Sequence, residues 1–477
     1  MQPNLASTLT RCLGLLCLLI APAAVAETLP EAIGKAVRTF RVPEEAISLV
    51  IQGIDEELPV VNLNPLEPRN PASSIKLLTT FVALDVLGPT YTWPTKLYGT
   101  GPIKDGVLNG DLVMKGYGDP FLVVEEFWKM LGDLRARGVH SITGDLVVDE
   151  SHFTVPESDP GAFDGQPFRL YNVIPSAALV NFKAIEFQFF RSKDRRSVDI
   201  RMNPVLPNLE ISNQLTVKEG KCRGYQFGIN MSVPDPVVAD RVVFSGAFPS
   251  ACRSHTMNRS LLQPGSYAYG TFKRLWGHWG GSIEGGYRSG KAPKNRALVV
   301  WRSRPLAEII RPLNKWSNNV MTRLMLYSLA AAKFSPPYTK AQGIEVLRSY
   351  LNENGLDDKD LILDNGSGLS RETRVTSQFM NDMLRYAYTH RYMPEFIASM
   401  SINGLDGTTR RRFRGGPEAG HMHLKTGRID NVAAIAGYVL AKSGKTYTVS
   451  LMLNYNNVHR GPGIEIQNAV LRWIYQQ

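Results

Sequence analysis

A serine and a lysine stand three positions apart in the stretch PASSIKLLTT, at Ser73 and Lys76. The apolar residues that follow, up to the stop signal Gly88-Pro89, predict a buried helix that begins near Pro71. Residues three apart share one face of a helix, so the two polar side chains should meet. An apolar setting lowers the pKa of a lysine because it disfavours the charged form, and a neutral lysine can accept a proton. The pair predicts a serine nucleophile with its own base.

Two later motifs could complete such a site, since a lone Ser-x-x-Lys also fits a capping serine followed by a surface-reaching lysine. Ser317-Asn318-Asn319 lies on the predicted turn between two helices, where a hydroxyl and a carboxamide could relay a proton and hold a substrate amide. Lys425-Thr426-Gly427 ends a short predicted strand. Its ammonium and hydroxyl suit a substrate carboxylate, and the glycine leaves room for a ligand beside the strand.

The three motifs, in this order, form the active-site set of penicillin-binding proteins and class A β-lactamases. With them, the chain resembles the penicillin-binding D-alanyl-D-alanine carboxypeptidase/endopeptidases of the low-molecular-weight class C type. The resemblance covers nearly the whole chain after its N-terminus, and it departs from the motif set at Asn318, where aspartate is frequent. It is carried by the motifs and by the stretches GDLVMKGYGDPFL, GDLVVDESHF, KWSNN, DNGSGLSRETRVTS and INGLDGTTRRRF.

The resemblance implies a role for each motif residue. Ser73 would attack the carbonyl of the penultimate D-alanine, with Lys76 as the base, and Ser317 and Asn319 would pass the proton to the leaving amine and orient the peptide. Lys425 and Thr426 would hold the terminal carboxylate, and the backbone N–H groups of Ser73 and Arg428 would bind the oxyanion. The implied substrate-binding residues are Lys425, Thr426, Gly427 and Arg428.

The implied fold is an α/β (α+β) penicillin-binding, serine β-lactamase-like catalytic domain, in which helices flank an antiparallel sheet, with β-rich insert domains. Short β-rich runs separated by Gly, Pro, Asn and Asp predict the insert at 93–289. The catalytic domain is expected to comprise 27–92 and 290–477. The C-terminal amphipathic helix is expected to pack on the sheet rather than on a membrane.

The N-terminus predicts export. One early charge, an apolar core and the Ala24-Val25-Ala26 pattern are typical of a signal peptide at 1–26, removed after Ala26. We therefore expect a periplasmic protein with no stable membrane anchor. In an oxidising compartment Cys222 and Cys252 could form a disulfide, although a sequence cannot show that they meet.

The expected partners are peptidoglycan stem peptides, with β-lactam antibiotics as covalent inhibitors. The formal net charge of +11 fits either attraction to an anionic envelope polymer or ordinary solubility. No nucleic-acid module, metal site or cofactor is indicated. A β-lactamase is disfavoured by the long insert between the first two motifs, and a non-catalytic cell-wall-binding protein on the same fold by the intact motif residues.

Several other residues could suggest chemistry, and each has a structural interpretation that we prefer. His421 and His423 alternate onto one strand face without an evident third metal ligand. The segment 364–370 reads as a rigid, Asp-capped loop near the site, and 410–412 as a solvated or acid-paired arginine run. Trp276 and Trp279 are expected to pack in the core or between domains rather than stack on sugars.

Overall fold

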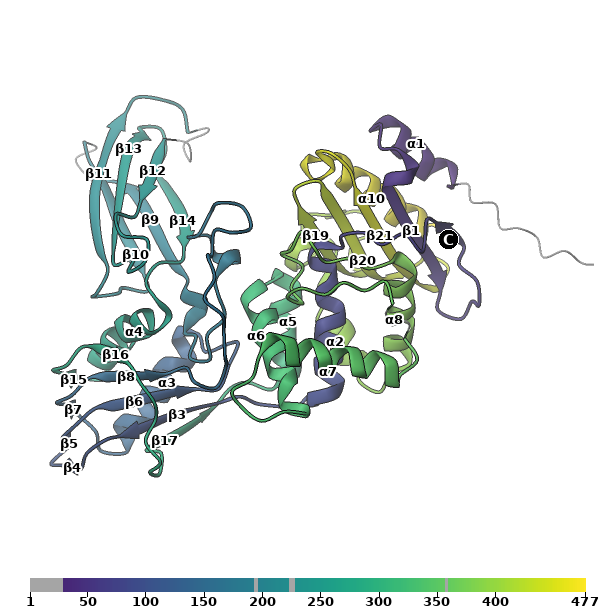
Figure 1. The fold of residues 1–477 in the computed structure, drawn as a ribbon. Helices are drawn as coiled ribbons and strands as arrows, with labels where there is room; N and C mark the ends of the chain where they lie inside the picture. The colour runs from purple at the N-terminus through teal and green to yellow at the C-terminus, as the bar shows by residue number, and fades with distance from the viewer. Residues whose placement is uncertain (1–28, 193–195, 223–227, 357–358) are drawn as a thin grey trace, which may run out of the picture.

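The computed structural model describes residues 29–477 except 193–195, 223–227 and 357–358, so the expected signal peptide and its cleavage site lie outside the described residues. Two lobes make up the molecule (Figure 1). One contains both ends of the described chain, and the other contains the β-rich middle of the sequence.

The first lobe is built on a six-stranded sheet of order β18-β19-β20-β21-β1-β2, in which every neighbouring pair is antiparallel. Strands from the start and end of the sequence therefore meet in the middle of one sheet, where β1 pairs with β21 over its full length. The strands are β1 (Ile47–Gly53), β2 (Val61–Leu63), β18 (Ser401–Ile402), β19 (Met422–Ile429), β20 (Val432–Leu440) and β21 (Thr446–Asn454).

Helices cover both faces of this sheet. One face is covered by α1 (Glu31–Thr39) and α10 (Pro462–Tyr475), which confirms the expected packing of the last helix on the sheet. The other face carries a larger layer: α2 (Lys76–Leu87), α5 (Leu306–Trp316), α6 (Asn319–Leu329), α7 (Lys340–Glu353), α8 (Ser377–Thr389) and α9 (Met393–Ala398).

The sequence of β20 shows why the sheet is buried on both sides. Along this strand Ala433 and Ile435 pack in the core under α10, whereas Ala434 and Ala436 pack in the core around α2. Successive side chains of a strand point to opposite faces, so a continuous apolar run suits a sheet between two helix layers. The predicted fold class, an antiparallel sheet flanked by helices with a β-rich insert, is confirmed.

The second lobe contains four smaller sheets and two helices around one large apolar core. A five-stranded sheet comprises β3 (Pro94–Gly99), β6 (Leu112–Gly116), β8 (Leu146–Asp149), β16 (Tyr287–Ser289) and β17 (Val299–Arg302). A four-stranded sheet comprises β4 (Ile103–Lys104), β5 (Val107–Leu108), β7 (Ser141–Ile142) and β15 (Ser282–Ile283). One three-stranded sheet comprises β9 (Ile185–Arg191), β10 (Val198–Asn203) and β14 (Ser254–Arg259). The other three-stranded sheet comprises β11 (Glu210–Lys218), β12 (Ile229–Ser232) and β13 (Arg241–Pro249). The helices are α3 (Val124–Ala136) and α4 (Pro264–His278).

The chain enters and leaves this lobe on neighbouring strands, because β3 and β17 pair antiparallel. Strand β17 lies after the expected boundary at residue 290, yet it completes the sheet of the second lobe; the boundaries themselves stay a prediction. Cys222 and Cys252 form a disulfide in this lobe. In the described part of the chain, no helix is both long and apolar enough to cross a bilayer.

Candidate active site

Ser73 lies in the turn that leads into α2, and this turn packs against β19. Figure 1 shows α2 beside the sheet that contains β19. The chain does not enter the helix directly at Pro71: residues Ala72–Ile75 form a 3-10 turn, and the α-helix begins at Lys76. Ala72 has a φ of 43°, a conformation that non-glycine residues rarely adopt, and such strain is often retained at functional sites. The turn leaves the Ser73 side chain partly exposed while Lys76 is fully buried.

Two glycines allow other segments to approach this turn. A Cβ on Gly427 would stand 2.4 Å from the carbonyl oxygen of Pro71, and one on Gly368 would stand 1.9 Å from that of Ala72. Gly368 also has a φ of 75°, which favours glycine. The glycine of the third motif therefore brings β19 against the turn that carries Ser73, in addition to any room it leaves for a ligand.

The amine of Lys76 lies among three oxygen atoms. Its Nζ is 2.9 Å from Ser73 Oγ and 2.6 Å from Asn319 Oδ1, and it also contacts the carbonyl oxygen of Ser367. Burial lowers the pKa of Lys76 well below its ordinary value, and the positive charges of Lys425 and Arg323 lower it further. A lowered pKa suits this amine to accept a proton from the neighbouring Ser73 hydroxyl.

The neighbours of Lys76 also orient the neutral amine. Asn319 Oδ1 and the Ser367 carbonyl oxygen can only accept hydrogen bonds, so they take the two N–H groups of a neutral lysine. In the protonated form Lys76 Nζ donates to Ser73 Oγ at 2.9 Å; in the neutral form its lone pair is left for this third neighbour, and the Ser73 hydroxyl can donate to it. This arrangement is the geometry that a general base needs at its nucleophile.

The second motif lies on the turn between α5 and α6, as expected from the sequence. Ser317 ends α5 with a φ of 59°, and Asn318 begins α6 by accepting a hydrogen bond from the Met321 backbone N–H at 3.1 Å. Asn319 donates from Nδ2 to the carbonyl oxygen of Tyr171 at 3.1 Å, so its amide is oriented by the β-rich lobe on one side and by Lys76 on the other.

Lys425 of the third motif is buried and faces the second motif. Its Nζ donates to Ser317 Oγ and to the carbonyl oxygen of Thr426, each at 2.8 Å. Burial lowers the pKa of Lys425 to about 7, because no carboxylate offsets the cost of removing its charge from water. The Ser317 hydroxyl therefore lies between the Lys425 ammonium and a ligand in the cleft. Thr426 Oγ1 donates to the Thr408 hydroxyl at 2.9 Å.

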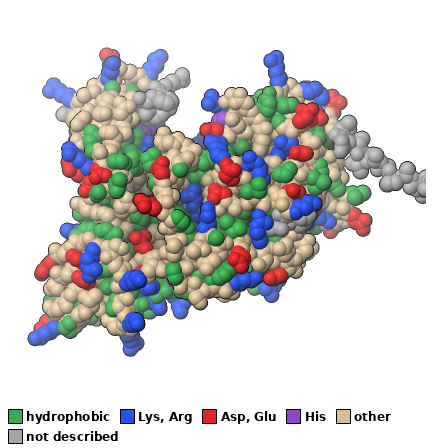
Figure 2. All heavy atoms as spheres, in the orientation of Figure 1, with side chains coloured by type: hydrophobic (Ala, Val, Ile, Leu, Met, Phe, Trp, Pro, Cys, Tyr) green, Lys and Arg blue, Asp and Glu red, His purple; other side chains and the backbone are tan. Residues whose placement is uncertain are grey.

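An open cleft of about 400 Å³ joins these motifs. Ser73, Ser317, Thr426 and Gly427 lie along it, whereas Lys76 and Lys425 lie behind its wall. The other lining residues are Thr408, Arg410, Arg412, Arg428, Ala433, Ile464 and Gln467. In the space-filling view a notch separates the two lobes, and Lys and Arg side chains are numerous where the first lobe borders it (Figure 2).

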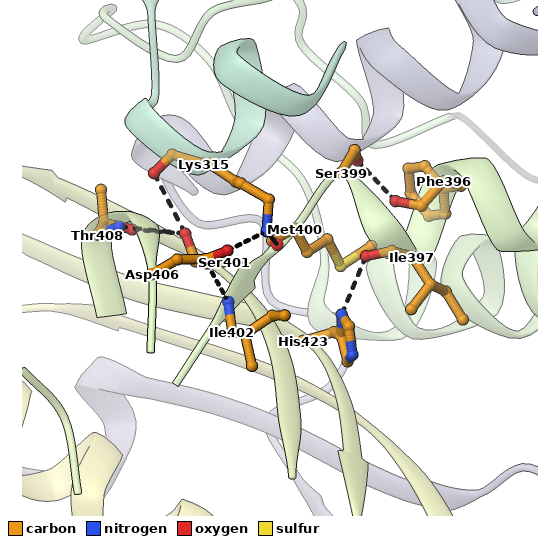
Figure 3. A network of polar contacts seen from close by, with 10 residues as sticks. All are labelled: Lys315, Phe396, Ile397, Ser399, Met400, Ser401, Ile402, Asp406, Thr408 and His423. Atoms are coloured by element: carbon orange, nitrogen blue, oxygen red, sulfur yellow. Dashed lines mark hydrogen bonds and ion pairs between the residues drawn. The ribbon is translucent and has the colours of Figure 1, made fainter. Parts of the chain in front are cut away.

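A polar network joins Lys315, two residues before the second motif, to the segment around β18 at the edge of the sheet (Figure 3). Lys315 donates to Asp406 Oδ2 at 2.6 Å and to the Met400 carbonyl oxygen at 2.8 Å. Ser401 Oγ donates to the Lys315 carbonyl oxygen at 3.2 Å and accepts from the backbone N–H of Thr408 at the same distance. The stretch Ser401-Ile402-Asn403 also has the Ser-x-Asn spacing of the second motif. These contacts give Ser401 a structural role, in which it holds α5 against the loop beside β19.

Sequence reasoning missed two contributors to the site. The carbonyl oxygen of Ser367, which contacts Lys76, could not be read from a motif, although the 364–370 loop does lie at the site as expected. Its polar cap comes from Asn365, whose Oδ1 accepts from the Ser367 backbone N–H at 3.0 Å. The interpretation of the arginine run as a solvated or acid-paired face is wrong for Arg412, which is largely buried in the cleft wall and bonds Gln467 at 2.9 Å.

The remaining candidates have structural roles. His423 Nδ1 contacts the Ile397 carbonyl oxygen at 3.1 Å, and the ring of His421 packs on Tyr475. Trp276 is fully buried, and Trp279 stacks on Trp128. Within the described residues no cluster of three or more His, Cys, Asp or Glu could hold a metal ion.

Comparison with known proteins identifies the family. The model of the D-Ala-D-Ala carboxypeptidase 3 (S13) family matches residues 29–476, which is nearly the whole chain. The chain belongs to this family. It is thus a serine carboxypeptidase of the D-Ala-D-Ala type, as the resemblance of its motifs predicted.

Individual relatives are similar over most of their length. The D-alanyl-D-alanine carboxypeptidase of Actinomadura sp. (strain R39) is 27% identical over 84% of this chain and 76% of its own. The carboxypeptidase DacB of Haemophilus influenzae is 23% identical over 92% and 93%. The structure of the Haemophilus protein, penicillin binding protein 4, matches with a TM-score of 0.78 over 94% of this chain and 100% of its own, at 21% identity. A predatory peptidoglycan endopeptidase of Bdellovibrio bacteriovorus matches with a TM-score of 0.52 over 90% and 92%, at 17% identity.

Proposed function

We propose that this enzyme hydrolyses the D-Ala-D-Ala end of peptidoglycan stem peptides through a Ser73 acyl-enzyme. The observation that supports this most strongly is the orientation of Lys76, whose two acceptor neighbours leave its lone pair for the Ser73 hydroxyl. Lys76 Nζ takes the Ser73 proton while Oγ bonds to the carbonyl carbon of the penultimate D-alanine, and the carbonyl oxygen becomes an oxyanion.

The oxyanion is stabilised by the backbone N–H groups of Ser73 and Arg428, each worth about 3 kcal/mol in comparable sites. Its collapse breaks the C–N bond, and the leaving nitrogen receives its proton through Ser317, whose hydroxyl lies against Lys425 at 2.8 Å. Water then attacks the ester, which releases the shortened peptide as a carboxylic acid and returns the proton to Ser73.

The substrate carboxylate is bound by Thr426 and by the charge of Lys425. The Thr426 hydroxyl faces the cleft, while the ammonium of Lys425 acts from behind the Ser317 hydroxyl. Because a D-alanine and the D-centre of a cross-linking diamino acid each present a carboxylate next to the scissile amide, the same contacts serve carboxypeptidase and endopeptidase reactions. The Bdellovibrio relative, a peptidoglycan endopeptidase, supports including the second reaction.

We further propose that penicillin acylates Ser73 and that the protein acts after export to the periplasm. A structure of the Haemophilus relative was obtained in complex with a β-lactam, which supports the first proposal. The second rests on the N-terminal pattern that ends at Ala26 and on the location of the polymer that the substrate belongs to.

Labelling with a fluorescent penicillin tests the mechanism. The wild-type protein should become covalently labelled and Ser73→Ala should not. Ser74→Ala is a matched control, because the Ser74 hydroxyl bonds the Pro71 carbonyl oxygen at 2.8 Å rather than Lys76, and it should still be labelled. Equal labelling of wild type and Ser73→Ala would refute the assignment of the nucleophile. Rapid turnover of penicillin without cleavage of a pentapeptide would favour the β-lactamase alternative.

A further inference from the structure

The wall of the active-site cleft next to the third motif is strongly basic. Arg410, Arg412 and Arg428 line it, and its lining contains no aspartate or glutamate. In the described part of the chain none of the three guanidinium groups is within ion-pair distance of a carboxylate. The charge of Glu465 is near enough to raise the pKa of Arg412, but it forms no ion pair with it. The wall therefore keeps an excess of positive charge, which attracts an anionic ligand.

Arg412 is held in this wall with unused hydrogen-bonding capacity. Its Nη2 donates to Gln467 at 2.9 Å, but its buried Nη1 has no hydrogen-bond partner. Burial lowers the pKa of Arg412 to about 10, which still leaves it charged at neutral pH. A buried guanidinium donor without a partner is costly, and an anion in the cleft would relieve that cost.

Arg410 is fixed at the mouth of the same cleft. Its guanidinium lies over the ring of Trp316, 5.6 Å from the centroid, and donates to the Gly407 carbonyl oxygen at 3.1 Å. Trp316 is 59% exposed, so this cation–π pair forms an open rim rather than part of the core. Both contacts orient the guanidinium without neutralising it.

The position of the arginines relative to Thr426 indicates which part of a substrate they meet. The Thr426 hydroxyl bonds that of Thr408, and Arg410 follows Thr408 by two residues. Thr426 is the proposed contact for the carboxylate next to the scissile amide, and the arginines line the same cleft, where a leaving group longer than D-alanine could reach them. D-Alanine has no further charge to offer there, whereas the acceptor peptide released from a cross-link carries additional carboxylates along its chain.

We propose that Arg410 and Arg412, with Arg428, form an anion subsite that binds a second carboxylate on the leaving group. The inference rests on the proposed function and adds a substrate preference to it: the enzyme favours cross-linked peptides with an anionic acceptor chain over a terminal D-alanine. Thr426 and Lys425 bind the first carboxylate, and the arginine wall binds the second.

Three synthetic substrates with one acyl group test this subsite. Their leaving groups are D-alanine, D-norleucine and D-α-aminoadipate; the last two differ by the replacement of a terminal methyl with a carboxylate. Wild-type kcat/KM should be about ten- to a hundred-fold higher for aminoadipate than for norleucine. This factor corresponds to the usual strength of hydrogen bonds to a charged group. High salt should reduce this ratio because the cleft is open.

Variants identify the residues responsible. Arg410→Gln and Arg412→Gln should each reduce the aminoadipate-to-norleucine ratio at least five-fold, and Arg412→Lys should retain part of it. Arg411→Gln is the matched control, since Arg411 is exposed and does not line the cleft. It should keep the wild-type ratio. Labelling by fluorescent penicillin shows which variants have a folded active site. If Arg412→Gln does not fold, the aminoadipate-to-norleucine ratios of Arg410→Gln and Arg412→Lys test the subsite instead.

A wild-type ratio near one, or an equal loss in Arg411→Gln, would overturn the subsite while the enzyme still cleaves the D-alanine substrate. Failure to cleave any of the three substrates, or to react with penicillin, would instead contradict the proposed function. The two failures are therefore distinguishable.

Discussion

A buried ion pair in the β-rich lobe and the buried catalytic lysine of the first lobe have different surroundings. In the β-rich lobe the fully buried carboxylate of Asp149 meets Lys115 Nζ at 3.0 Å and accepts backbone N–H groups from Ser151 and Ala292. Burial acts to raise the pKa of Asp149, but these hydrogen bonds outweigh it and lower the pKa. At the start of α2, by contrast, Lys76 is buried among hydrogen-bond acceptors but without a carboxylate partner. The first arrangement stabilises a charge, and the second makes a proton easy to remove.

The difference separates a structural site from a catalytic one. An ion pair with all its hydrogen bonds satisfied holds two strands together, since Lys115 and Asp149 are neighbours across β6 and β8. A buried amine without counter-charge destabilises the fold but can act as a base. Substitutions at the two positions should therefore have opposite consequences for activity and stability.

The largest expected effect is on acylation by Lys76→Met. Methionine fits the apolar surroundings of α2, so the protein should fold, but Ser73 loses its base. The second-order rate of labelling by fluorescent penicillin should fall by about a thousand-fold or more, within the range for loss of general-base catalysis. A rate within ten-fold of wild type would show that another group activates Ser73.

Lys115→Met should give the converse result. Removing the partner of a buried carboxylate leaves Asp149 with an uncompensated charge, which costs about 3 kcal/mol of the free energy of unfolding. Urea denaturation measures that loss, and penicillin labelling below the transition should keep its wild-type rate. A variant that labels slowly at full stability would mean that the β-rich lobe contributes to the chemistry through this pair.

A smaller effect concerns the pH dependence of stability. Lys425 has a pKa of about 7 when folded and near its ordinary 10.5 when unfolded, so between these values the unfolded chain binds more protons. The contribution of Lys425 to stability therefore rises with pH across this window, by on the order of 2 kcal/mol from pH 7 to pH 9. Comparison of urea unfolding at the two pH values should show this gain in wild type and its reduction in Lys425→Met. An equal gain in stability in both proteins would mean that a group other than Lys425 causes the pH dependence.

The order and identity of the three motifs could be predicted from the sequence because each is local. Ser73 and Lys76 share one turn, and Ser317 and Asn319 share another, so their types and spacing are visible without a structure. The class of fold followed from the same motifs and from the change in strand pattern along the chain.

Contacts across long sequence separations could not be predicted in this way. The carbonyl of Ser367 is a backbone group, and nothing in its residue type marks it as the acceptor that orients Lys76. Arg412 lies in a run of arginines that composition assigns to solvent, but the loop after β18 turns it into the cleft wall. The direction of Lys425 toward Ser317 also depends on how β19 packs against α5, which only tertiary structure determines.

The central claim is that Lys76 is a neutral amine when it faces Ser73. Its protonation can be followed by NMR of lysine labelled with 13C at Cε, with the Lys76 signal assigned by its absence in Lys76→Met. The account predicts that Lys76 titrates well below the ordinary lysine value of 10.5. A Lys76 signal that remains protonated at pH 9.5 in the folded protein would contradict it.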